Sequence, residues 1–318
     1  MNILIDYLRF TSKIHSLENL VDLLGLHKVT WEEGKARDGW TLHEYHGGMH
    51  LYHGGRDDIG VEFSGSGCRM LESVNGDSFD WIGLFRYIVD QGDDMNVSRL
   101  DIAGDDKEDL LSMKQLFRYT QARKYICKAR RCVWMQGDEQ EILFGASSSA
   151  TRLRIYNKAL ERGVDEHWIR CEFQLRDEAA DSFILNLLQI GEIGETYGGV
   201  LLNYLRYTTK SPDGCQNHHD RLDTVIWWDR FVKTARKIKN IKVGGLEYNY
   251  GNLEEFIFRQ CTSSLLAFTI ANGGSMDKLQ SMIAGAKLSH KHKVLLKEMG
   301  FDVNAEDAEV RKALKSGL

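Results

Sequence analysis

Short stretches in which apolar and polar residues alternate are the main pattern in the first two thirds of the chain. Alternation with a period of two places successive side chains on opposite faces of an extended strand. Glycine pairs and glycine-containing turns between the stretches predict hairpins, and therefore antiparallel pairing. The predicted strands cover residues 2–11, 40–45, 49–52, 60–64, 98–103, 133–136, 141–144, 152–157 and 168–175.

Apolar residues spaced by three and four positions predict helices between these strands. The predicted helices of this part of the chain cover residues 17–24, 79–89, 107–127 and 179–190. Because strands followed by a helix occur twice in the same order, we expect an internally duplicated arrangement with halves 1–106 and 107–206. The similarity between the halves is too weak to define a sequence repeat.

The last third of the chain has a different, mainly helical pattern. It follows a predicted linker, residues 207–221, which contains the only proline, Pro212. Asn252 and Glu255 have the spacing of a capping box that opens a helix reaching residue 270. The Asn-Gly-Gly sequence at 272–274 is expected to end that helix, and the tail beyond it is expected to be helical.

These patterns predict an α+β fold with an antiparallel β-sheet core in residues 1–206 and a helical C-terminal region, residues 207–318. Apolar residues make up 42% of the chain, which suffices for a packed core. No apolar run approaches the roughly 18 residues of a membrane span, so we expect a cytoplasmic globular protein. The six cysteines form no C-x-x-C pair and are expected to be reduced thiols.

Charge is unevenly distributed along the chain. The net charge of −5 argues against a general polyanion-binding protein. However, residues 114–131 contain seven basic side chains and no acidic one, and residues 227–242 contain six basic side chains and a single acidic one. Such patches attract a phosphate backbone, although a solvated helix face would look the same. The candidate DNA contacts in these patches are Arg130, Arg131, Arg230 and Lys237.

The second basic patch begins with two aromatic residues, Trp227 and Trp228. Aromatic residues mixed with basic ones are typical of a helix that binds DNA. A core helix with a basic outer face would have the same pattern, so both interpretations stay open.

Three predicted strands combine an apolar face with a charged face. The charged faces carry Asp101 and Asp105 on the first, Arg152, Arg154, Tyr156 and Lys158 on the second, and Arg170, Glu172, Gln174 and Arg176 on the third. A solvated outer sheet face explains any one of them. Together, carboxylates suit a hard divalent cation, guanidinium groups neutralise phosphate, and a phenol can attack phosphorus. The set therefore suits metal-assisted phosphodiester chemistry.

The same segments resemble the replication initiation factor family, which comprises initiators of certain Gram-positive rolling-circle plasmids and related relaxases of integrative conjugative elements. The resemblance covers roughly residues 2–266 with the order and spacing of the motifs intact. Its strongest parts are residues 99–106, residues 144–158 with Arg-Ile-Tyr-Asn-Lys, and residues 168–176. Residues 60–72 and 227–231 are similar to the mobile-element branch.

The resemblance implies a tyrosine that cuts one DNA strand, keeps the 5′ phosphate as a phosphotyrosine and leaves a free 3′ hydroxyl. The family motif places this nucleophile at Tyr156, with Arg154 and Lys158 beside it. Arg152 and Arg170 are further expected DNA contacts. The implied activity is origin-specific nicking and rejoining, which starts rolling-circle replication or conjugative transfer.

The resemblance also implies a divalent metal, Mg²⁺ or Mn²⁺, bound by oxygen ligands. The implied ligands are Asp101 and Glu172, with Asp105 or Asp106 as the third. The sequence lacks the His-hydrophobic-His triplet of better-known nicking enzymes. The histidine cluster could replace it, but a hairpin turn interrupts its irregular spacing, which favours exposed or stacked rings. That cluster consists of His43, His46, His50 and His53, and a second group, His218, His219 and Asp220, lies in the linker.

Two alternatives to a tyrosine nicking enzyme remain at this point. One is a sequence-specific DNA-binding protein of the same fold without nicking activity, and the other is a metal-dependent nuclease that uses water. The expected partners are origin DNA, as a hairpin or single-stranded nick site, a helicase, and a second copy of the chain in a homodimer. We expect residues 207–318 to serve DNA binding or oligomerisation, and the sequence leaves the origin and the kind of mobile element open.

Overall fold

The computed structural model describes most of the chain and divides it into two compact units, residues 1–245 and 246–318. The described residues are 1–76, 79–212, 221–242, 253–254, 257, 261–288 and 290–316. The capping box at Asn252 and Glu255 and the group His218–Asp220 lie outside them. None of the helices in this described part has the length and apolar character that a membrane crossing requires.

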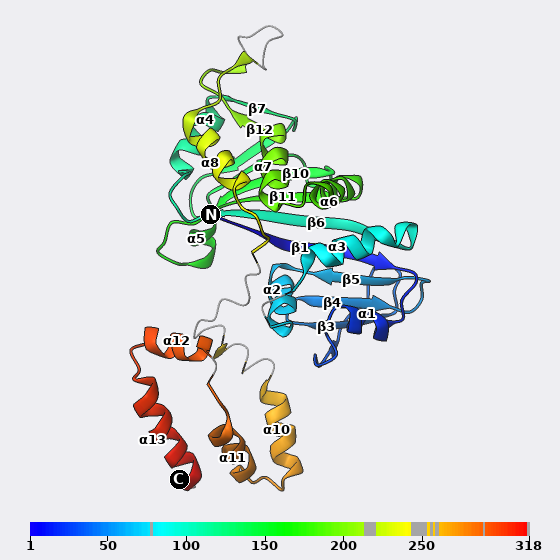
Figure 1. The fold of residues 1–318 in the computed structure, drawn as a ribbon, viewed down its shortest axis with the longest axis vertical. Coiled ribbons are helices and arrows are strands. Elements are labelled where there is room, and N and C mark those ends of the chain that lie inside the picture. The colour runs from blue at the N-terminus through cyan, green and yellow to red at the C-terminus, as the bar shows by residue number, and fades with distance from the viewer. Residues whose placement is uncertain are drawn as a thin grey trace. The chain divides into compact units, whose positions relative to one another are not determined.

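A ten-stranded antiparallel sheet forms the centre of the first unit (Figure 1). Its strand order is β2-β3-β4-β5-β1-β6-β11-β10-β9-β8. The strands are β1 (Asn2–Ser12), β2 (Glu32–Glu33), β3 (Leu42–His46), β4 (Met49–His53), β5 (Ile59–Phe63), β6 (Met95–Asp106), β8 (Cys132–Met135), β9 (Glu141–Phe144), β10 (Thr151–Asn157) and β11 (Ile169–Arg176). A separate two-stranded sheet pairs β7 (Tyr125–Cys127) with β12 (Leu205–Tyr207).

The sheet is symmetric about the boundary between β1 and β6, the two long strands at its centre. Beyond β1 lie β5, β4 and β3, and beyond β6 lie β11, β10 and β9. Each half is thus a long strand followed by a three-stranded antiparallel meander whose last strand pairs with the long strand. This symmetry confirms the predicted α+β fold with an internally duplicated arrangement.

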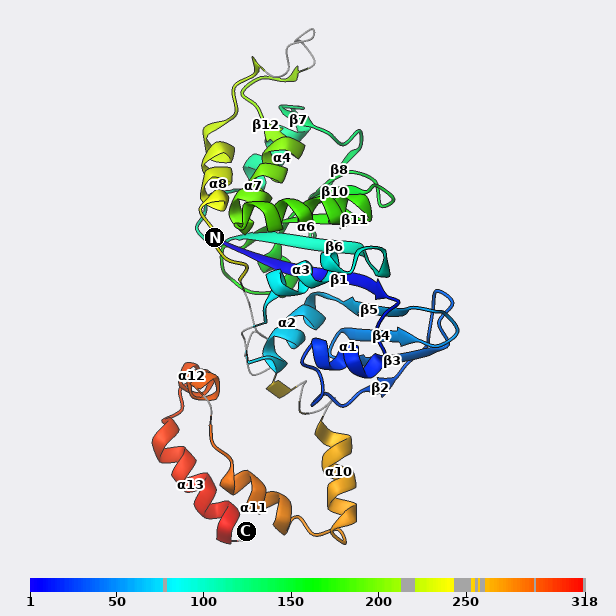
Figure 2. The same ribbon diagram turned by 45° about the vertical axis from the view of Figure 1, so that its right-hand side comes forward.

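Helices pack against one face of the sheet (Figure 2), and the charged residues of β6, β10 and β11 lie on the opposite face. The helices of the first unit are α1 (Leu17–Leu23), α2 (Gly65–Val74), α3 (Trp81–Asp90), α4 (Met113–Gln121), α5 (Lys158–Arg162), α6 (Glu178–Ile190), α7 (Ile193–Tyr204) and α8 (Ile226–Arg236). Helix α7 packs closely, because the Tyr197 hydroxyl donates to the Cys171 carbonyl at 2.7 Å, and Phe173 contacts Tyr197 edge-on. Only glycine fits at position 104, where a Cβ would lie 2.7 Å from the Tyr197 hydroxyl.

The helix predicted over residues 107–127 is wrong at both ends. The Asp106 carboxylate accepts hydrogen bonds from the backbone N–H groups of Glu108 and Leu111, which holds a turn before α4. Residues 125–127 leave the helix because they pair with β12. The sequence does not predict α7, because its glycines disfavour a helix. In the structure Gly194 lets α7 approach α8, since a Cβ there would lie 2.4 Å from the Ala235 carbonyl oxygen.

The first unit extends past the expected boundary at residue 206. The Trp228 side chain is fully buried and its Nε1 donates to the Leu205 carbonyl at 3.2 Å. Since Phe231 is also fully buried, α8 belongs to the core of the first unit. Trp228 is therefore a core residue and not a stacking surface for DNA, whereas Trp227 is only half-buried and the basic side chains of α8 are exposed.

The second unit is helical, as predicted. Its described helices are α10 (Thr262–Ala271), α11 (Asp277–Gly285), α12 (His290–Glu298) and α13 (Val303–Ser316). Helix α10 ends at Ala271, where Asn272 caps the helix and both following glycines have positive φ angles. The predicted stop at residues 272–274 is therefore confirmed.

Candidate nicking site

The predicted nucleophile, Tyr156, lies near the end of β10 on the polar face of the sheet. Its hydroxyl donates a hydrogen bond of 2.8 Å to Glu172 on the neighbouring strand β11. The register of these strands pairs Arg154 with Glu172 and Tyr156 with Arg170. Tyr156 and Glu172 are each about 5% exposed, so this hydrogen bond lies in a largely dehydrated place.

Two cations flank the Tyr156 ring. The Arg154 guanidinium carbon lies 4.7 Å from the ring centroid and the Lys158 Nζ lies 5.5 Å from it. Arg154 also donates to Glu141 at 2.6 Å and to Glu172 at 3.3 Å. Lys158 is the first residue of α5, not part of the strand as expected, and its buried side chain forms an ion pair with Glu161. Both cations nevertheless meet at Tyr156.

An ion-pair cluster adjoins the tyrosine. Arg170, which is 4% exposed, donates two hydrogen bonds to Asp105, at 2.6 and 2.9 Å, and contacts Asp6 at 2.9 Å. Two carboxylates thus bind the Arg170 guanidinium, so in this structure it does not point to a DNA contact as expected. No sequence pattern predicts the role of Asp6, because an irregularity between Ile5 and Tyr7 interrupts the alternation of β1 there.

Several carboxyl groups of this face perturb one another. Burial, followed by the charges of Asp6 and Asp101, raises the pKa of Glu172 to about 7, although Arg154 opposes the shift. Burial also raises the pKa of Asp101. Burial would raise the pKa of Asp6 too, but the charges of Arg170 and other nearby cations bring it below the usual range. Burial, then the charge of Glu172, raises the pKa of the Tyr156 phenol far above its usual value. Attack by this phenol at neutral pH therefore needs a proton acceptor.

The expected metal ligands are each engaged by other groups. Arg99 donates to both oxygens of Asp101, at 2.9 and 2.5 Å, and Arg170 occupies both oxygens of Asp105. The Asp106 carboxylate instead binds backbone N–H groups and His167. Within the described ranges, no three His, Cys, Asp or Glu side chains lie together closely enough to hold a metal ion.

The remaining candidate DNA contacts lie in different places. Arg152 is half-buried on β10, two residues before Arg154, and its Nε has no hydrogen-bond partner among the described residues. The other four candidates are exposed: Arg130, Arg131, Arg230 and Lys237.

The histidine cluster lies on the same sheet but in its first half. The rings of His43 and His50 stack with centroids 5.3 Å apart, and His43 also stacks on Tyr52 at 4.5 Å. His53 pairs with Glu44 at 3.1 Å. Two of the four histidines, His43 and His50, therefore stack, and His46 meets Trp31 edge-on.

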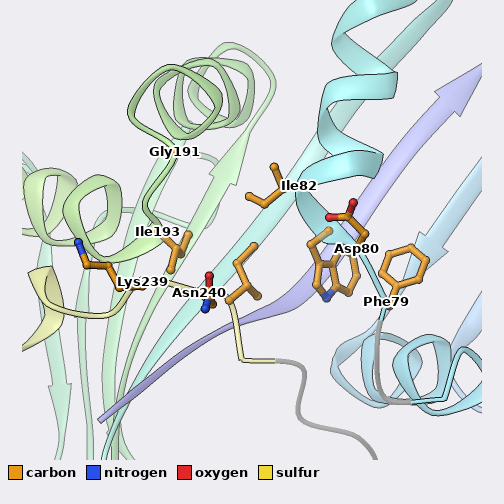
Figure 3. A pocket seen from close by; sticks show the side chains of 9 residues that line it. Phe79, Asp80, Ile82, Gly191, Ile193, Lys239 and Asn240 are labelled. Atoms are coloured by element: carbon orange, nitrogen blue, oxygen red, sulfur yellow. The ribbon is translucent and has the colours of Figure 1, made fainter.

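A pocket lies between the start of α3, the start of α7 and residues 239–241 (Figure 3). Ile82 and Ile193 supply apolar lining, and Asp80 and Lys239 lie at its edges. Asp80 caps α3 by accepting from the Gly83 N–H at 2.9 Å. None of the predicted site residues lines this pocket, which gives it no part in the chemistry at Tyr156.

Residues 95–283 match the family model described as replication initiation factor. The chain is also 24% identical over 321 residues to NicK of Bacillus subtilis (strain 168), a protein named as a DNA relaxase, covering 92% of this chain and 88% of that protein. A rolling circle replication initiator protein from Geobacillus stearothermophilus has a similar structure, with a TM-score of 0.68 at 24% identity. It covers 76% of this chain and 98% of its own. The chain therefore belongs to the replication initiation factor family, and the last similarity supports its fold.

Proposed function

We propose that this protein nicks and rejoins one strand of DNA at an origin, with Tyr156 as the nucleophile, to start rolling-circle replication or conjugative transfer. The observation that carries the proposal is the hydrogen bond of 2.8 Å from Tyr156 to Glu172, between the cations Arg154 and Lys158. Membership of the replication initiation factor family and similarity to a DNA relaxase support the substrate class.

The proposed chemistry is a transesterification. The Tyr156 oxygen forms a bond to phosphorus while the bond from phosphorus to the 3′ oxygen breaks, which leaves a 5′ phosphotyrosine and a 3′ hydroxyl. Glu172 accepts the phenolic proton, and the 3′ oxygen takes a proton from solvent. A base with a pKa near 7 suits proton transfer near neutral pH. Arg154 and Lys158 neutralise charge that develops on the phosphate.

The bond energy is kept in the phosphotyrosine. A 3′ hydroxyl can therefore attack it, release Tyr156 and rejoin the strand when replication or transfer ends. Water would lose that energy, so a hydrolytic nuclease would not rejoin. A DNA-binding protein without activity would need neither the tyrosine nor its proton acceptor.

We further propose that Asp101 and Glu172 would hold Mg²⁺ or Mn²⁺, with water or a phosphate oxygen of the DNA completing the ligand set. Their chemistry fits a hard cation, since both offer carboxylate oxygens and they lie near enough for the charge of Asp101 to raise the pKa of Glu172. The bound cation would supply positive charge beside the scissile phosphate. Asp105 is paired with the buried Arg170 and is left out of this set, whereas a cation at Asp101 would have to displace Arg99 from both carboxylate oxygens.

The second unit is proposed to serve DNA binding or self-association, with a helicase as a further partner during replication. Helix α10 supports an apolar contact, because Leu266 and Ile270 are 60% and 67% exposed. Large exposed apolar side chains in a helical unit are typical of an interaction surface.

The decisive experiment incubates the protein with supercoiled DNA that carries the element's own origin. We expect nicked circles linked to protein, and a nucleotide adduct on the tryptic peptide that contains Tyr156. Tyr156→Phe should abolish cleavage while origin binding persists, and Tyr119→Phe is the matched control that should cleave normally. Cleavage that persists in Tyr156→Phe, or an adduct on another tyrosine, would refute the assignment.

A further inference from the structure

The two halves of the sheet repeat the site as well as the strand order. Strand β5 has the sequence Ile59-Gly-Val-Glu-Phe, and β11 starts with the similar sequence Ile169-Arg-Cys-Glu-Phe. In the first half Tyr52 pairs with Gly60 and His50 with Glu62. In the second half Tyr156 pairs with Arg170 and Arg154 with Glu172. Tyr52 and Glu62 therefore occupy, in the first half, the positions of Tyr156 and Glu172.

Aromatic residues replace the charged groups around this second tyrosine. Gly60 stands at the position of Arg170, and Trp40 fills the space, because a Cβ on Gly60 would lie 2.7 Å from the Trp40 ring. The cross-strand partner of Tyr52 is His43, where Tyr156 has Glu141. The first half thus keeps the backbone arrangement of the nicking site and has rings in place of Arg170 and Glu141, while Glu62 still forms ion pairs with Arg9 and Arg37.

These rings form a continuous row, which we call the ring row. Trp40 stacks on Tyr52 at 5.5 Å, and Tyr52 stacks on His43 at 4.5 Å. His43 stacks on His50 at 5.3 Å, and His50 on Tyr45 at 6.4 Å. Burial lowers the pKa of both histidines, which keeps their rings neutral at physiological pH. The rings of His43, Tyr45 and His50 are only half-buried.

Guanidinium groups lie over the ring row. The Arg37 guanidinium carbon lies 5.1 Å from the centroid of the Tyr52 ring, and that of Arg56 lies 4.4 Å from the centroid of Trp40. Their side chains are 48% and 42% exposed. Aromatic rings together with arginine are the parts from which proteins build platforms for unpaired bases.

Unpaired arginine nitrogens connect the ring row to the nicking site along the same sheet face. In the strand register Glu62 lies opposite Arg9, Arg9 lies opposite Arg99, and Arg99 lies opposite Arg176. These four residues therefore share one face of the sheet. The Nε atoms of Arg176 and Arg152 are buried without a hydrogen-bond partner among the described residues. Phosphate oxygens are acceptors that would satisfy such donors.

We infer that the ring row binds unpaired bases of the same DNA strand whose phosphate is attacked by Tyr156, with Arg152 and Arg176 contacting the backbone between them. This inference rests on the proposed function for its substrate. The two sites are five inter-strand steps apart, or at least about 24 Å at about 4.8 Å a step. The first half of the sheet therefore holds the strand and the second half cuts it.

The test measures binding without cleavage, by fluorescence anisotropy of a labelled single-stranded thymidine oligonucleotide of about 16 nucleotides. The full-length Tyr156→Phe protein is used with a chelator present. Tyr45→Leu and His43→Leu should each weaken binding about five-fold or more, as loss of a stacked base predicts. Tyr45→Phe keeps the ring and should bind normally. Trp134→Leu is the matched control, because Trp134 is an exposed aromatic residue of β8 (43% exposed) outside the ring row.

Photo-crosslinking of an iodouracil-containing oligonucleotide to the unsubstituted protein provides a second measurement that needs no variant. We expect crosslinks in the peptides that carry residues 42–53. Unchanged affinity of both leucine variants, or crosslinks that avoid these peptides, would overturn the inference. Both assays measure binding and not cleavage. They can therefore be interpreted even if Tyr156 is not the nucleophile, and each of the two proposals can be refuted without the other.

Discussion

Replacing Glu172 by glutamine tests the proposed chemistry at its proton acceptor. The glutamine side chain has the same shape, so it can still accept the hydrogen bond from Tyr156, which is 2.8 Å long in the parent. It cannot take the proton away. General base catalysis contributes about 100- to 10,000-fold to a rate, so Glu172→Gln should slow single-turnover cleavage of an origin oligonucleotide by about 100-fold or more.

The pH dependence of cleavage follows from the same group. A base must be deprotonated to act, and the pKa of Glu172 lies near 7. The parent rate should therefore rise with pH and level off by about pH 7, or at a lower pH when the cation held beside Glu172 favours its charged form. Glu172→Gln should lack this rise, since no carboxyl group titrates at that position.

The substitution should have the opposite effect on stability. A carboxyl group whose pKa is raised on folding destabilises the folded state once the pH exceeds its unfolded value. This loss of folding free energy grows as the pH rises from 4.5, the ordinary pKa of a glutamate, to about 7. The shift corresponds to about 3 kcal/mol at most above pH 7. Glu172→Gln should raise the melting temperature at pH 8 and leave it nearly unchanged at pH 4. The gain is reduced because Arg154 loses a charged partner.

Glu141→Gln is the matched control for this experiment. Glu141 also pairs with Arg154, at 2.6 Å, but it receives no hydrogen bond from Tyr156. We expect a much smaller loss of cleavage and an unchanged pH profile. Equal losses in the two variants, or a Glu172→Gln profile that still rises through pH 7, would show that Glu172 is not the proton acceptor.

Three further predictions concern the metal, the DNA contacts and the fold. Excess EDTA should stop cleavage and Mn²⁺ or Mg²⁺ should restore it, whereas undiminished nicking in chelator would remove the metal from the proposal. Replacing Arg130 and Arg131 by alanine should reduce the slope of log affinity against log salt by about one to two units if both contact phosphate, and an unchanged slope would place them on a solvated face. Gly104→Ala should lower the free energy of unfolding by about 1–3 kcal/mol, measured by urea denaturation, because its Cβ would lie 2.7 Å from the Tyr197 hydroxyl. Gly199→Ala, where a Cβ meets nothing within 4 Å, is its control.

Much of the candidate nicking site, which lies in the second half of the sheet, could be predicted from the sequence. Strand β10 alternates strictly, so Arg154 and Tyr156 had to share a face, and the same holds for Arg170 and Glu172 on β11. Local alternation depends only on the geometry of an extended chain, so it can be recognised before the fold is known. The start of α4, at Met113 and not at residue 107, could not be predicted in the same way, because the Asp106 side chain holds a turn before it.

Tertiary structure decided which of these polar residues meet. Pairing in register brought the Tyr156 hydroxyl to Glu172, and a one-residue slip would have turned every side chain to the other face. The contact of Asp6 with Arg170 joins residues far apart in sequence at an irregular point of β1, where no local period exists. The correspondence of Tyr52 with Tyr156 likewise appears only when both meanders are aligned on the central strands. The sequence alone determined the periodic faces, whereas strand register and long-range pairing determined the site.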